Sequence, residues 1–160
     1  MKKILLLLLF ISSFSYAQNV IEDNDITENN VMIVKQTVAY DLKNPTEFYR
    51  LKCDNPTYAQ FASGEESFKN DLGLNIKSFL NSGLYSVNGT FEVILSISKT
   101  GNLQNIQLKP EVQNSHLLQR DVELAIRKLN LKFTPAKCGE TAIDSRLRQK
   151  IDFHTDAFDI

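Results

Sequence analysis

Side chains with reactive chemistry are few in this chain, which has two cysteines, Cys53 and Cys138, and two histidines, His116 and His154. A cysteine–histidine nucleophile or a metal site would need several such groups close together. No C-x-x-C, H-x-x-x-H, glycine-rich phosphate loop or G-x-S-x-G occurs in the sequence. We therefore expect exposed histidines, no metal, no cofactor and no enzymatic activity.

The two cysteines are expected to form a disulfide. An even number of cysteines favours a bridge in an exported chain. A bond between Cys53 and Cys138 would close a long loop, and the chain-entropy model assigns such a bond roughly 4 kcal/mol of stabilisation. Two buried free thiols or a redox-active pair are the alternatives, and the wide separation of the cysteines in sequence disfavours the redox-active pair.

Side chains suited to binding lie in an alternating stretch at residues 146–153. The alternation has a period of two, which predicts a strand with one half-buried face. The basic row on its other face has two interpretations: a solvated face whose charge discourages edge aggregation, or a surface that meets an acidic peptide. The buried row is Leu147, Gln149, Ile151 and Phe153, and the opposite row is Arg146, Arg148, Lys150 and Asp152.

The first 17 residues have the pattern of a secretory signal peptide, with two lysines, an apolar run and a cleavage site predicted between Ala17 and Gln18. The apolar run is shorter than the ~20 residues that a membrane-spanning helix needs. We therefore expect residues 18–160 to be periplasmic and to have no membrane span. A net charge of −1 provides no electrostatic reason to expect nucleic acid or anionic lipid as a partner.

The elements that must position the strand at 146–153 begin with an N-terminal arm at 18–57. Its first part is polar and acidic. Residues 31–40 are rich in β-formers and predict a strand at a sheet edge. A second strand is predicted at 46–53.

Two amphipathic helices and a hairpin make up the rest of the predicted core. A helix is expected at 63–80 and a second helix at 116–130. The apolar stripe of the first helix is Phe68, Leu72, Ile76 and Phe79, with Leu80. Residues 89–108 alternate and turn at Gly101, which predicts a β-hairpin. Two helices covering a small antiparallel sheet predict an α+β, two-layer domain at 58–154, ordered helix, strand, strand, helix, strand. An acidic tail is expected at 155–160.

This order of elements resembles the C-terminal domain of TonB, the energy transducer for outer-membrane uptake in Gram-negative bacteria. The residues that carry the resemblance are the helix start at 63–68, Gly89 with the alternating row after it, the turn at 99–101 and the aromatic-x-Pro of 133–135. The chain departs from the family pattern at Phe133, where relatives carry tryptophan. We also expect a stand-alone module without the family's membrane anchor and Pro-rich linker.

The resemblance implies that the last strand, at 146–153, accepts a protein or peptide segment by strand addition, with an outer-membrane transporter as the expected partner. The alternative is a structural or assembly protein. In that case the domain self-associates through its sheet edges as a homodimer, or residues 18–57 cap the edge.

Overall fold

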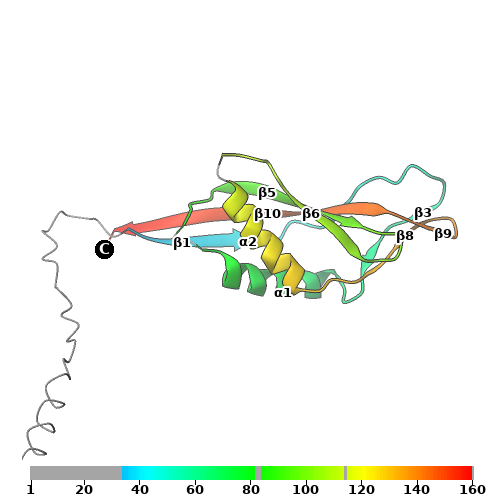
Figure 1. Ribbon diagram of the computed structural model, residues 1–160, viewed down its shortest axis with the longest axis horizontal. Helices are drawn as coiled ribbons and strands as arrows, with labels where there is room; N and C mark the ends of the chain where they lie inside the picture. The colour runs from blue at the N-terminus through cyan, green and yellow to red at the C-terminus, as the bar shows by residue number, and fades with distance from the viewer. Residues whose placement is uncertain (1–33, 82–83, 114, 160) are drawn as a thin grey trace, which may run out of the picture. The chain divides into compact units, whose positions relative to one another are not determined.

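The computed structural model describes residues 34–81, 84–113 and 115–159. The predicted signal peptide and the first part of the predicted arm lie outside these residues. The described chain has two helices and antiparallel strands, so the predicted α+β class is confirmed (Figure 1). The elements are β1 (Val34–Asp41), β2 (Glu47–Phe48), β3 (Pro56–Thr57), β4 (Gln60–Phe61), α1 (Glu65–Phe79), β5 (Gly89–Ile97), β6 (Leu103–Lys109), α2 (Ser115–Lys128), β7 (Phe133–Thr134), β8 (Ala136–Cys138), β9 (Thr141–Ile143) and β10 (Ser145–Asp159).

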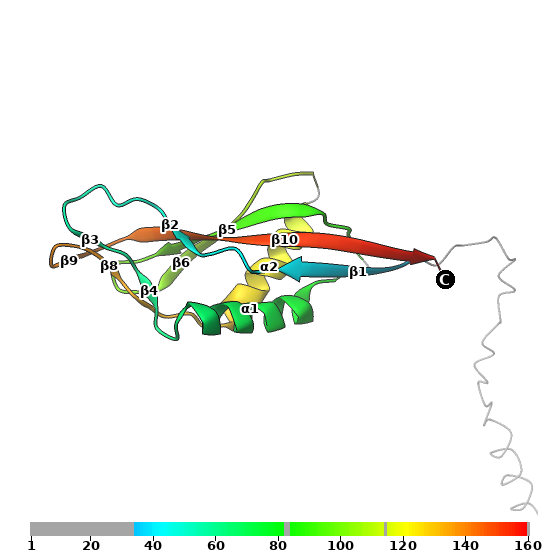
Figure 2. The ribbon, with the colours of Figure 1, turned by 180° about the vertical axis from the view of Figure 1, so that it is seen from behind.

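The main sheet has five strands, in the order β1-β10-β5-β6, with β2 also paired to β10. All of these pairs are antiparallel. Figure 1 shows α2 in front of the sheet, and Figure 2 shows the sheet from its other side. In both views only the arrowhead end of β1 lies next to α1, and the rest of β1 extends past the helix.

The core lies between the two helices and one face of this sheet. The β5 row at 91, 93, 95 and 97 is buried, as are Phe68, Leu72 and Ile76 of α1. Fully burying one such side chain contributes about 1.5–3 kcal/mol. The predicted hairpin and the predicted stripe on the first helix are therefore confirmed, and α2 presents its own buried stripe at 118, 122, 125 and 126.

The hairpin turn depends on a glycine. Gly101 has a φ of +78°, and a Cβ at this position would lie 2.1 Å from the carbonyl oxygen of Phe133. The backbone N–H of Phe133 donates to the Gly101 oxygen at 3.0 Å. The turn thus packs directly against the strand that follows α2, and no side chain fits between them.

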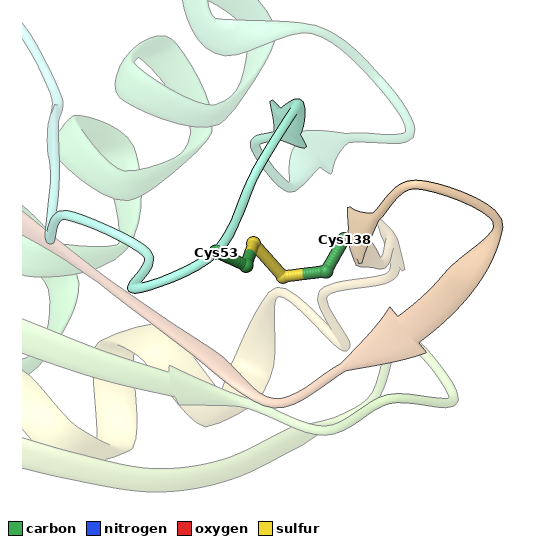
Figure 3. Close-up of a disulfide and its surroundings, with 2 residues drawn as sticks. All are labelled: Cys53 and Cys138. Carbon is green, nitrogen blue, oxygen red and sulfur yellow. A yellow bond between two sulfur atoms is a disulfide. The ribbon is translucent and has the colours of Figure 1, made fainter.

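The remaining strands form two small sheets that are separate from the main sheet. One has the order β3-β8-β9, and the other pairs β4 with β7. The predicted disulfide between Cys53 and Cys138 is confirmed, with the two Cα atoms 5.9 Å apart (Figure 3). It joins the segment that leads into β3 to the last residue of β8, next to the pairing of Pro56 with Cys138.

Two predictions about the strands need correction. Only Glu47–Phe48 of the predicted strand at 46–53 is a strand. The residues expected as an acidic tail continue β10 as far as Asp159, because β1 pairs with them. β1 and β2, expected in the N-terminal arm, both pair with β10, in agreement with the alternative that residues 18–57 cap a sheet edge.

Candidate strand-addition site

The N-terminal side of β10 is covered by the chain itself. β1 pairs with residues 152–159, and β2 pairs with Leu147 and Arg148. The backbone N–H of Tyr49 also donates to the Arg146 oxygen at 3.0 Å. β5 occupies the opposite side from Ser145 to Phe153. The prediction that residues 146–153 offer an open edge is therefore wrong, because both sides of that stretch are already in contact with the chain.

Gln149 closes the gap between β1 and β2. Its side chain is fully buried. The amide nitrogen donates to the backbone oxygen of Asn44 at 2.8 Å, and the amide oxygen accepts from the hydroxyl of Thr46 at 2.9 Å. The Asn44 amide donates in turn to Asp152 at 2.8 Å. Side-chain hydrogen bonds thus hold the 42–46 connection on β10 where no strand pairs with it.

The basic row of β10 lies on the less buried face, as predicted, and each member has a partner in the chain. Arg148 contacts Glu47 at 2.5 Å and Glu92 at 3.1 Å, and Lys150 contacts Glu47 at 3.0 Å. The Arg148 guanidinium lowers the pKa of the Glu47 carboxyl, with a smaller contribution from Lys150. The guanidinium of Arg146 lies 4.7 Å from the ring centre of Tyr49. An acidic peptide would have to compete with these contacts.

β1 is one of the two outer strands of the main sheet, and β6 is the other. Within residues 34–81, 84–113 and 115–159, β1 pairs with β10 alone. The edge position predicted for the strand at 31–40 is therefore confirmed. The backbone groups of an unpaired edge are a template for another extended chain.

A groove of about 880 Å³ lies between the end of β1 and α1. It is lined by residues 40–43 on one wall and by Glu66, Lys69, Asn70, Gly73 and Leu74 on the other. The hydroxyl of Tyr40 donates to the Gly73 oxygen at 2.6 Å and fixes the spacing of the walls. Burial raises the pKa of Tyr40, so this hydroxyl keeps its proton at neutral pH.

The groove combines paired charges with apolar surface. Lys43 lies 2.7 Å from Asp41 and lowers the pKa of that carboxyl, while Lys69 lies 2.8 Å from Glu65 on α1. Leu74 is 68% exposed. Gly73 adds no side chain to the wall, and a Cβ there would make only ordinary contacts, 3.6 Å from Leu42. An extended backbone with apolar side chains matches this surface.

The residues considered for catalysis do not come together. Both cysteines are in the disulfide, and His154 lies 3.0 Å from Asp156 at an exposed position on β10. His116 is in the first turn of α2. In the part of the chain that the structure describes, no cluster of three or more metal-ligating side chains occurs, and no helix has the length and apolar character to cross a membrane.

Sequence reasoning found β1 but missed the groove beside it. The available signal was in the first helix, where Leu74 is a large apolar residue outside the apolar stripe and follows Gly73, which has no side chain. Comparison of the chain with models of known families, with curated proteins and with solved structures found no match. The geometry of the sheet edge is thus the basis for the functional proposal.

Proposed function

We propose that this chain is an exported, non-enzymatic binding module that accepts an extended segment of a partner protein by strand addition to β1. The observation that carries this proposal is the open edge of β1 beside the groove along α1. In strand addition, backbone hydrogen bonds supply affinity and side-chain pockets supply selection. Both components are available here.

The resemblance to the TonB C-terminal domain supports the choice of partner. The two helices and the antiparallel sheet agree with a two-layer arrangement of that kind, and the resemblance implies a segment of an outer-membrane transporter as the ligand. The disulfide favours an oxidising compartment, consistent with a periplasmic location. The binding edge differs from the one the resemblance implies, since β1 and β2 occupy the N-terminal side of β10.

The experiment is a titration of the isotope-labelled chain, purified after export, with synthetic peptides that cover transporter plug domains. Amide shifts should concentrate at residues 34–43 and 66–74. Shifts at 146–153 with release of β1 would instead place the ligand on β10. If no peptide shifts any of these amides, the proposal is wrong.

A pair of substitutions that each introduce a carboxylate tests whether the ligand occupies the groove. Leu74→Glu places a carboxylate on the α1 wall and should weaken binding at least tenfold, equivalent to about 1.4 kcal/mol. Leu124→Glu is the control, because Leu124 is 44% exposed on α2 and lines neither this groove nor β1. Equal effects of both variants would contradict a ligand in the groove.

A second candidate function is self-association through sheet edges. The observation in its favour is that the same open edge of β1 can pair antiparallel with that of a second copy, in a closed two-fold arrangement. Light scattering over a dilution series decides between the two: a dimer that persists on dilution favours assembly, and a monomer favours a peptide ligand.

A further inference from the structure

A second groove, of about 570 Å³, lies at the N-terminal end of α1. Its apolar lining includes Phe48 of β2 together with Tyr58, Ala59 and Phe61. The rings of Phe48 and Tyr58 are 5.6 Å apart between centroids. Tyr58 is 38% exposed, so an aromatic wall faces solvent here. The volume is within the range of ligand-binding clefts, about 300–1,000 Å³.

Three short strands that line this groove, β2, β3 and β4, each have one edge that no other strand pairs with in the described chain. Among the described residues, β2 pairs only with β10, and β4 pairs only with β7. β3 likewise pairs only with β8. The disulfide between Cys53 and Cys138 fixes the segment that carries β3 and β4 (Figure 3). The walls are therefore held in place without a ligand.

The two grooves follow one path along α1. The first is lined by α1 from Glu66 to Leu74, and the second reaches the start of α1 at Gly64 and Glu65. Figure 2 shows β1 near one end of α1 and β2 with β4 near the other. Between the two grooves, the Thr46 backbone N–H donates to the Glu65 carboxylate at 3.0 Å.

We infer that the groove at Phe48, Tyr58 and Phe61 is the anchor pocket for a large apolar or aromatic side chain of the same extended segment that pairs with β1. This inference rests on the proposed function. The path from Asp41 to Phe48 is at most about 23 Å at ~3.3 Å per residue, so a ligand of about twelve residues reaches both grooves.

The lining also selects the charge next to the anchor. Glu65 is the one charged residue among those that line this groove in the described chain, and its side chain is 41% exposed. Lys69 lowers its pKa, so the carboxylate is ionised at neutral pH. Lys69 already contacts this carboxylate at 2.8 Å, so a basic residue beside the apolar anchor would share the charge with Lys69, whereas an acidic residue is repelled. The ligand class is thus an extended peptide with an apolar or aromatic anchor flanked by lysine or arginine.

The test uses a displayed library of random twelve-residue peptides, selected on the chain purified after export. Enriched peptides should share a large apolar residue beside a basic one. Replacing that anchor with alanine in a selected peptide should weaken binding at least tenfold. Enriched peptides that shift the amides of β1 but lack a shared anchor would overturn this inference and leave the proposed function standing.

Two variants localise the anchor. Thr57→Trp fills the groove from an exposed position on β3 and should weaken anchored peptides at least tenfold. Thr141→Trp makes the same change at an exposed position on β9 that lines neither groove, and binding should stay within twofold. Urea unfolding midpoints of both variants verify folding. Equal affinities for the two variants would overturn the inference, and a library without enrichment on the unmodified chain would overturn the proposed function with it.

Discussion

The two sides of β10 are held by different forces. On one side β5 forms a continuous ladder from Gly89 to Ile97, and its alternate side chains are buried in the core. On the other side the cover is discontinuous: β1, then the hydrogen bonds of Gln149, then β2. Apolar burial stabilises the first contact. The second combines the backbone ladder of β1 with half-buried apolar side chains such as Val38 and Phe48, and polar and ionic side chains hold the stretch between β1 and β2.

This difference indicates which side of β10 can separate from its neighbours without opening the core. A buried apolar ladder separates only when the core opens, because its burial is cooperative with the helices. Polar contacts at a half-buried edge contribute less each and are replaceable by another polar partner or by water. The N-terminal segment is therefore the side of β10 that can yield locally, while the β5 side remains fixed.

The most damaging change is expected at the turn that supports the β5 side. Gly101→Ala should destabilise the chain by about 2–5 kcal/mol, combining ~1–2 kcal/mol for left-handed backbone and ~1–3 kcal/mol for a displaced neighbour. The neighbour is the oxygen of Phe133, only 2.1 Å from the new Cβ. Urea unfolding with the disulfide intact measures the change.

Gly139→Ala is the control for this variant. Gly139 has a φ of +60°, with nothing within 4 Å of an added Cβ, so only the backbone cost applies. The expected loss is about 1–2 kcal/mol. Equal losses for the two variants would show that the contact with Phe133 contributes nothing.

An intermediate effect is expected from the polar contact that closes the N-terminal side. Gln149→Leu keeps the buried volume but leaves the Asn44 oxygen and the Thr46 hydroxyl without this partner, at about 1–3 kcal/mol. Hydrogen exchange should quicken at residues 34–48 and stay unchanged at 89–97. Ile151→Val, on the same buried row, is the control. It should destabilise the chain by about 0.5–1.5 kcal/mol without selectively quickening hydrogen exchange at residues 34–48. Uniform quickening in Gln149→Leu would refute the local role.

The smallest effect on stability is expected when acid protonates the carboxylate of Glu47. The pKa of Glu47 lies below its ordinary value of 4.5 because of Arg148 and then Lys150. Its ionised form therefore stabilises the fold at neutral pH, and this contribution disappears as the pH falls from about 5 through the lowered pKa. Unfolding midpoints at pH 7 and pH 3 should differ less in Glu47→Gln than in the unmodified chain.

Glu111→Gln is the matched control for Glu47→Gln. Lys109 likewise lowers the pKa of Glu111, but that pair lies at the end of β6, on the opposite border of the sheet. Both variants should reduce the dependence of stability on pH, and only Glu47→Gln should quicken exchange at residues 46–49. Quicker exchange there in Glu111→Gln would contradict the assignment of this effect to β2.

The sequence by itself determined the faces of the elements, the turn at Gly101 and the fact that a disulfide, if formed, joins Cys53 to Cys138; the structure shows that the bond forms. Alternation specifies which side chains of a strand point inward, and a helical repeat does the same for a helix, because both are local properties of the backbone. The disulfide followed from the presence of only two cysteines.

Only the tertiary structure decided which strands are neighbours. A period of two is the same in an edge strand and in a central one, so residues 146–153 read equally well as either. The contacts that cover β10 come from residues about a hundred positions earlier, such as Asn44 with Asp152 and Glu47 with Arg148. Local patterns contain no information about such partners. For the same reason, the grooves along α1 emerged only once the chain was folded, whereas the edge position of the strand at 31–40 was predicted from its residues.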